Sequence, residues 1–184
     1  MKEIKIFSRG GQGAVTAAKI LVAAAIKEGK YGQAVPSFGQ ERKGAPVFTF
    51  ARLDQEPIST HTYVYHPHAV VVFDLFLLDL GINPCEGARE DALLIANSDI
   101  DPAKLEIGSY FSRTGCVDAW HITREIIGPV PPNAAMLGAF ARTTDWVGID
   151  AICVALEEFM PGSKGEKNAA CARAAYERTI IYGR

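Results

Sequence analysis

The sequence predicts an α/β fold, with a Rossmann-like, mostly parallel sheet flanked by helices and an inserted β-hairpin. A short apolar run, Ile4–Phe7, ends in a glycine-dense turn that opens onto strong helix formers at 17–26. Continuous apolar runs at 69–73 and 92–97 are typical of strands buried on both faces of a sheet. With 184 residues, of which 48% are apolar, the chain can bury one core, so we expect a single domain over 1–184.

The first third of the chain predicts one helix, a long loop and the hairpin. The first helix should end near Gly29. Glycine, proline and charged residues break up the stretch 31–46, which we expect to be a surface loop. The apolar stretch 47–53 is typical of a strand, 54–57 of a turn, and the partly alternating 58–65 of the second strand of the hairpin.

The rest of the chain alternates strands with helices before becoming mostly helical. The strand 69–73 ends at Asp74, near the carboxyl edge where ligands bind in such sheets. A shorter strand at 115–118 should lead into a helix that continues through Ile127. Asn133 follows two prolines and is expected to cap a helix. The last three helices are expected over 133–144, 150–159 and 164–182.

Charge and hydropathy exclude several classes of protein. The net charge of −2 gives no general attraction for nucleic acid or for an anionic membrane. No apolar stretch approaches the roughly 20 residues that span a bilayer. The first strand begins almost at the N-terminus, which argues against a cleaved signal sequence. We therefore expect a cytoplasmic protein with neither nucleic acid nor membrane as a partner.

The residues that usually carry redox, metal or hydrolytic chemistry are scattered. The four cysteines are far apart and form no C-x-x-C pair, so the sequence predicts neither an iron–sulfur cluster nor a zinc site. His66 and His68 are separated by a proline and have no clear third ligand, so we interpret them as surface histidines. No G-x-S-x-G elbow presents a nucleophile. The chain therefore shows no self-contained active site and no predicted catalytic residue.

The glycine loop Gly10–Gly13 is the strongest functional signal. A strand, a glycine loop and a helix start together aim backbone N–H groups and the positive helix end at an anion, usually a phosphate. Gly10 and Gly13 fit the G-x-G-x-x-G pattern, but Ser8 replaces its first glycine. The segment 31–36 lacks the carboxylate that would hold a ribose, which makes ordinary NAD binding less favoured. The alternative is a glycine turn that only lets the first helix pack closely on the sheet.

A second candidate is the charged segment 40–43. Glycines and prolines on both sides restrict its shape, and Ser37 and Phe38 add a hydroxyl group and an aromatic ring. Ordering such a mixed loop favours a binding role. The alternative is a solvated loop with internal salt bridges.

Four blocks of the chain resemble the gamma subunit of 2-oxoacid:ferredoxin oxidoreductases. The segment 8–18 is similar to the family's G-R-G-G-Q-G opening, and 36–47 to its P-S-F-G-P-E-R-R-G-A-P-V. The segments 133–139 and 166–168 are similar to its N-T-A-M-L-G-A and K-x-N patterns. The chain departs from these patterns at Ser8, Gln40, Lys43 and Ala134. Lys43 keeps the positive charge of arginine but loses its planar fork of donors.

The resemblance implies a subunit of a larger enzyme. In this family the complex oxidatively decarboxylates a 2-oxoacid to an acyl-CoA and reduces ferredoxin. Thiamine diphosphate lies on the alpha and beta chains, and iron–sulfur clusters lie on the beta and delta chains. The gamma chain is implicated in holding coenzyme A, and the second block favours a pyruvate or 2-ketoisovalerate type. Expected partners are therefore the alpha, beta and delta subunits, with ferredoxin as the acceptor.

The residues expected to contact coenzyme A or a partner chain come from three of these blocks. They are Arg9, Gly10, Gly11, Gln12, Gly13, Ser37, Phe38, Glu41, Arg42, Lys43 and Asn133. Positive side chains are included because phosphates need charge-assisted donors. Two alternatives remain open, a stand-alone Rossmann-type nucleotide-binding oxidoreductase and a purely structural subunit.

Overall fold

A computed structural model describes residues 1–36 and 44–183, and it contains a seven-stranded sheet with the strand order β2-β3-β1-β4-β5-β6-β7. The strands are β1 Lys2–Arg9, β2 Tyr31–Pro36, β3 Pro46–Asp54, β4 Ala69–Val72, β5 Leu93–Asn97, β6 Arg113–Val117 and β7 Ile180–Gly183. The central strands β1, β4, β5 and β6 are parallel. The outer strands β2, β3 and β7 each pair antiparallel with a neighbour. The predicted α/β fold with a mostly parallel central sheet is confirmed.

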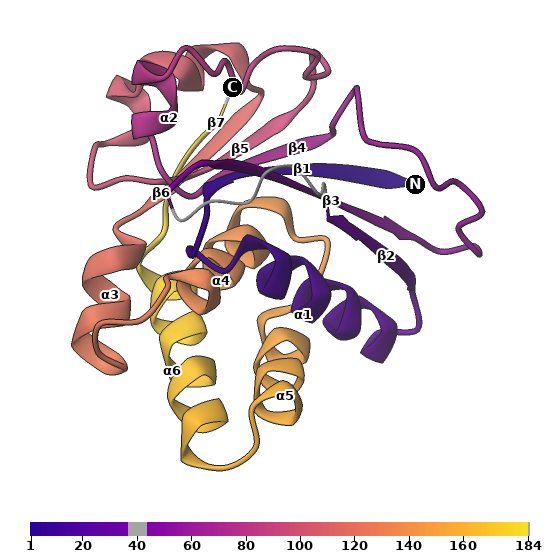
Figure 1. Ribbon diagram of the computed structural model, residues 1–184, viewed down its shortest axis with the longest axis vertical. Helices are drawn as coiled ribbons and strands as arrows, with labels where there is room; N and C mark the ends of the chain where they lie inside the picture. The colour runs from indigo at the N-terminus through magenta and orange to yellow at the C-terminus, as the bar shows by residue number, and fades with distance from the viewer. Residues whose placement is uncertain (37–43, 184) are drawn as a thin grey trace.

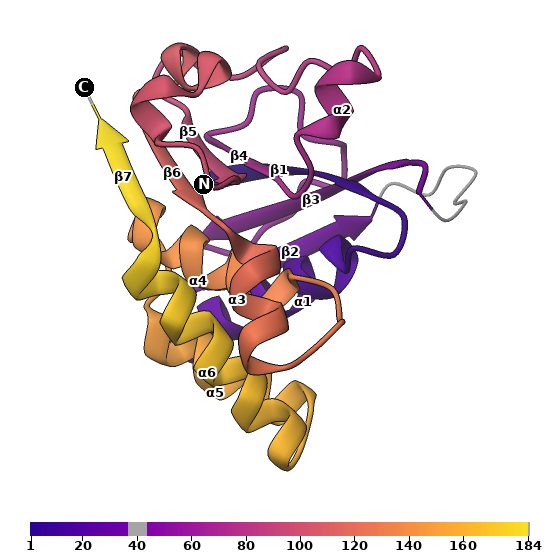
Figure 2. The same ribbon diagram turned by 90° about the vertical axis from the view of Figure 1, so that its left-hand side faces the viewer.

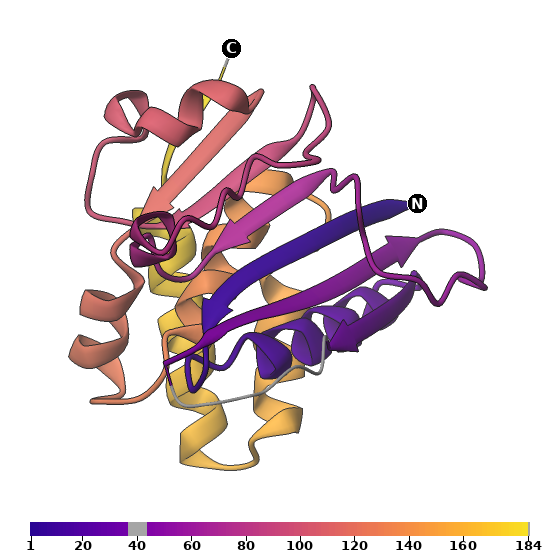
Figure 3. The same ribbon diagram turned by 45° about the horizontal axis from the view of Figure 1, so that its top comes forward.

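The two faces of the sheet are covered unequally (Figures 1 and 2). The helices are α1 Ala14–Lys27, α2 Phe76–Asp79, α3 Ala119–Ile126, α4 Asn133–Thr144, α5 Ile149–Phe159 and α6 Ser163–Arg178. Helices α1, α3, α4, α5 and α6 lie on one side of the sheet, and α2 lies on the other (Figure 1). Two short 3₁₀ helices, Pro102–Lys104 and Glu106–Tyr110, join α2 on that thinner side. Figure 3 shows the strands side by side with the larger helices behind them.

Each face of the sheet has its own hydrophobic core, because neighbouring side chains of a strand point to opposite faces. Ile4 and Ile6 of β1 are buried against the helical layer. Phe7 is buried on the other face, in a cluster that includes Leu77 of α2. In the helical layer, α4 and α6 pack very closely, since a Cβ added at Gly138 would meet the carbonyl oxygen of Ala172.

The structure differs from the prediction in the position of the hairpin and in an additional strand near the C-terminus. Residues 31–36, expected to be loop, form β2, and the antiparallel hairpin is β2–β3. The alternating segment 58–65 forms no strand. The expected last helix ends at Arg178 instead of Tyr182, because the β-branched and aromatic residues that follow pair with β6 as β7.

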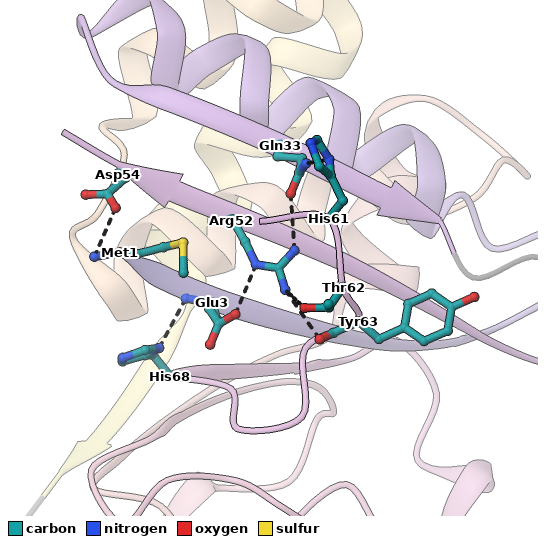
Figure 4. A network of polar contacts seen from close by, with 9 residues as sticks. All are labelled: Met1, Glu3, Gln33, Arg52, Asp54, His61, Thr62, Tyr63 and His68. Atoms are coloured by element: carbon teal, nitrogen blue, oxygen red, sulfur yellow. Dashed lines mark hydrogen bonds and ion pairs between the residues drawn. The ribbon is translucent and has the colours of Figure 1, made fainter. Parts of the chain in front are cut away.

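A buried arginine in β3 contacts the irregular segment that follows this strand (Figure 4). The Arg52 side chain is only 1% exposed, and its Nε donates to Glu3 Oε1 at 3.0 Å. Its Nη1 donates to Gln33 Oε1 at 3.1 Å and its Nη2 to the Tyr63 carbonyl at 3.3 Å. The guanidinium thus ties β1, β2 and β3 to the chain that leads into β4 (Figure 4). The network lies at the amino end of β1, at the opposite end of that strand from the glycine loop.

Candidate functional site

The glycine loop lies at a topological switch point of the sheet, where the connections from two neighbouring strands lead to opposite sides. From β1 the chain continues through α1 to β2, on one side of β1. From β4, the parallel neighbour of β1, it continues through α2 to β5, on the other side. Ligands of open α/β sheets bind at such a switch point, outside the carboxyl ends of the strands. The glycine loop follows β1 at this edge, and Asp74 follows β4.

Two positive φ angles give the loop its shape. Gly11 has φ +95°, and Gly13, which caps α1, has φ +81°. A Cβ added at Gly13 would lie 3.1 Å from Asn133 Nδ2, so the loop and the start of α4 approach closely. The structure therefore brings Asn133 to the glycine loop, as expected. The prediction that Asn133 caps α4 is wrong, because Pro132 occupies the cap position and Asn133 is the first helical residue.

Several donors of the loop are already used within the chain. The Gly10 N–H donates to the Ala45 carbonyl at 2.8 Å, and the Gln12 N–H donates to the Arg9 carbonyl at 3.1 Å. The Arg9 N–H donates to Gln12 Oε1 at 2.7 Å. Gly10 and Gln12 thus use their backbone donors to shape the loop.

The first turn of α1 has backbone N–H groups that are not used within the helix. The first intrahelical bond runs from the Ala17 N–H to the Gly13 carbonyl, so the three preceding helical N–H groups have no partner within the helix. Within residues 1–36 and 44–183, no other acceptor contacts the N–H groups of Ala14, Val15 and Thr16. The first turn contains no acidic residue, so no carboxylate of α1 competes for an anion there.

Asp74 is the centre of the polar contacts at the switch point. Its Oδ2 accepts from Gln12 Nε2 at 2.8 Å and from Arg9 Nη1 at 3.3 Å, and its Oδ1 accepts from the Phe76 N–H at 3.0 Å. Arg9 Nε also donates to the Gly44 carbonyl at 3.2 Å. The positive charge of Arg9 is therefore balanced by a carboxylate that was not among the predicted site residues. The sequence placed Asp74 at this edge but gave no sign of its contacts.

Five predicted site residues, Ser37, Phe38, Glu41, Arg42 and Lys43, lie outside the described residues. The described chain that follows them is joined to the glycine loop. The Gly44 N–H donates to the Gly10 carbonyl at 3.2 Å, alongside the bond from Gly10 to Ala45. The end of the second sequence block therefore meets the first block, although the two are far apart in sequence.

The other cysteine and histidine side chains of the described residues form no metal site. Among residues 1–36 and 44–183, no three His, Cys, Asp or Glu side chains gather closely enough to hold a metal ion. Burial raises the pKa of Cys116 to about 12, so its thiol stays protonated at neutral pH. His66 is exposed, whereas His68 is half-buried and accepts from the Glu3 N–H at 3.1 Å, and burial lowers its pKa. In the same part of the chain, no helix is long and apolar enough to cross a membrane.

Comparisons with known proteins agree with the sequence blocks. The family model described as pyruvate ferredoxin/flavodoxin oxidoreductase matches residues 3–178. The chain is 42% identical over 184 residues to the pyruvate/ketoisovalerate oxidoreductases common subunit gamma of Thermococcus kodakarensis, with 99% of each chain covered.

Solved structures share the fold. A pyruvate oxidoreductase subunit of Thermotoga maritima matches with a TM-score of 0.83 and 33% identity, over 98% of this chain and 97% of that one. A 2-oxoglutarate:ferredoxin oxidoreductase of Magnetococcus marinus matches in fold with a TM-score of 0.67 and 16% identity, over 96% of this chain and 30% of that one. The predicted kinship with gamma subunits is confirmed, and the chain belongs to the pyruvate ferredoxin/flavodoxin oxidoreductase family.

Proposed function

We propose that this chain is the gamma subunit of a pyruvate- or ketoisovalerate-type oxidoreductase, and that the N-terminus of α1 holds a phosphate of coenzyme A. The observation that carries the proposal is the first turn of α1 at the β1–β4 switch point, where three N–H groups have no acceptor among residues 1–36 and 44–183. Three backbone donors and the positive end of a 14-residue helix converge there. The loop is shaped by the hydrogen bond from the Arg9 N–H to the Gln12 side chain. Asn133, at the start of α4, lies directly against Gly13.

The names of the relatives support coenzyme A over the oxoacid as the ligand. The Thermococcus relative is named as a subunit common to pyruvate and ketoisovalerate oxidoreductases. A subunit shared by enzymes with different oxoacids fits a role toward the co-substrate that both reactions use. The solved Magnetococcus enzyme carries bound coenzyme A. Thiamine diphosphate, the iron–sulfur clusters and the contact with ferredoxin are assigned to the alpha, beta and delta partners.

Adding a negative charge to the first turn of α1 tests this proposal. Thr16→Glu places a carboxylate at the third helical position, where it favours the helix but repels a bound phosphate. We expect the KM for coenzyme A of the assembled complex to rise about tenfold, which corresponds to roughly 1.4 kcal/mol of repulsion. The matched control is Thr16→Gln, which has nearly the same size and no charge, and should leave KM within about twofold of the wild type.

The same pair of variants separates the competing roles. If Thr16→Glu weakens association with the partner chains while KM for coenzyme A stays unchanged, the helix end faces a subunit, and the coenzyme A proposal is wrong. A separate titration of the isolated chain with NAD tests the stand-alone nucleotide-binding alternative. Binding of NAD would support that alternative, although the chain lacks the carboxylate that usually holds the ribose.

A further inference from the structure

We propose that Phe76 is the platform on which the adenine base of coenzyme A stacks, an inference that rests on the proposed function. Phe76 is the first residue of α2 and comes two positions after Asp74. Its side chain is 49% exposed, although it follows the most buried part of the sheet. Arg9 covers part of the ring, with its guanidinium carbon 5.2 Å from the ring centroid. The ring is thus fixed beside the glycine loop and remains accessible.

One carboxylate contacts both the Arg9 side chain and the Phe76 backbone. Asp74 Oδ2 accepts from the Arg9 guanidinium, and Asp74 Oδ1 accepts from the Phe76 N–H. Gln12 Nε2 also donates to Oδ2, at 2.8 Å, which joins the pair to the loop that leads into α1. Asp74 therefore links the backbone of Phe76, the Arg9 guanidinium and the glycine loop that precedes α1.

These contacts suit Arg9 to stacking better than to phosphate binding. A guanidinium that is already paired with a carboxylate has less positive charge to offer a phosphate, but its flat face still packs against an aromatic ring. The backbone donors of α1 can bind phosphate without it. A ligand that combines a phosphate with a planar base would use both features, and coenzyme A contains both in its nucleotide half.

Removing the ring should weaken the binding of only those ligands that contain the base. Because stacking on an aromatic ring stabilises a bound base, Phe76→Ala in the assembled complex should raise KM for coenzyme A about tenfold with kcat unchanged. The inhibition constant of ADP should rise by a similar factor. Inorganic pyrophosphate, which has phosphates and no base, should inhibit as it does the wild type. Phe76→Tyr keeps the ring and should behave as the wild type, and so should Leu80→Ala, which removes an equally exposed apolar side chain just after α2.

Each contrary result has a distinct meaning. If Phe76→Ala weakens ADP and pyrophosphate equally, the ring only positions the loop, and the platform is wrong. If Thr16→Glu raises KM for coenzyme A and Phe76→Ala does not, the base lies elsewhere, and the phosphate site survives without the platform. If neither variant changes KM, the proposed function itself fails. Loss of subunit association in both Phe76→Ala and Leu80→Ala would assign the residue to a subunit interface and overturn the platform.

Discussion

Replacing Gly138 by alanine is expected to destabilise the chain by about 3 kcal/mol, although alanine is the better helix former. Gly138 lies in α4 where it crosses α6. An added Cβ would meet the Ala172 carbonyl oxygen, and would lie 2.8 Å from the Ala172 carbonyl carbon and 3.0 Å from the Tyr176 backbone nitrogen. These are backbone atoms of α6, which cannot rotate away as a side chain could. The helices must therefore separate, and the buried cluster between them loses contact.

Chemical denaturation of the isolated chain measures this effect, with Ala170→Gly as the control. Ala170 is exposed in α6, so its replacement should cost only the difference in helix propensity, about 1 kcal/mol. A stability of Gly138→Ala equal to or above that of the wild type would show that α4 and α6 do not approach as closely as described.

The Glu3→Leu variant is expected to lose about 3 kcal/mol of unfolding free energy, because it leaves the Arg52 charge buried without a counter-ion. Arg52 is 1% exposed, so water cannot replace the carboxylate that contacts its Nε at 3.0 Å. Gln33 and the Tyr63 carbonyl still accept from the guanidinium, but neither carries a charge. Urea denaturation at neutral pH measures the loss.

A double variant tests whether the buried charge is the cause. In Glu3→Leu/Arg52→Met both charges are gone, and a buried ion pair can often be replaced by apolar side chains at little cost. The double variant should therefore be more stable than Glu3→Leu alone. Glu56→Leu, which removes an exposed carboxylate beyond β3, should change stability by less than about 0.5 kcal/mol. If the double variant is the less stable one, Arg52 contributes through its hydrogen bonds and not through its charge pair.

The elements that sequence reasoning located are those with strong local signals. Helix α4 begins and ends as predicted, at Asn133 and Thr144, because two prolines precede it and Asp145 ends it in a left-handed conformation. The apolar run at 69–73 also became a buried parallel strand, β4. In both cases the neighbouring residues carry a strong signal for the element that forms.

The elements that it missed depend on distant partners. Gly32 and Pro36 are residues that disfavour a strand, so the sequence did not predict β2. The strand forms because it pairs with β3. Strand β7 follows a helix-forming segment and is defined by its pairing with β6. The segment 58–65 alternates like a strand, yet Arg52 binds the Tyr63 carbonyl and the segment pairs with no strand of the described chain.

In the candidate site, too, the features with a local signal were predicted and those that depend on distant residues were not. The glycine loop was evident from its own residues, since only glycine readily adopts the positive φ of Gly11 and Gly13. Asp74 and Phe76 were not evident, because their contacts with Arg9 join residues more than sixty positions apart. A single sequence contains no signal of such pairings. The structure supplies them, and it shows Arg9 paired with Asp74 and lying over the Phe76 ring.

The most direct measurement is an experimental structure of the assembled complex with coenzyme A bound. We expect a phosphate oxygen of coenzyme A within about 3 Å of the backbone nitrogen atoms of the first turn of α1, at Ala14, Val15 or Thr16. A complex in which that turn is buried against a partner chain, with coenzyme A bound elsewhere, would contradict the assignment.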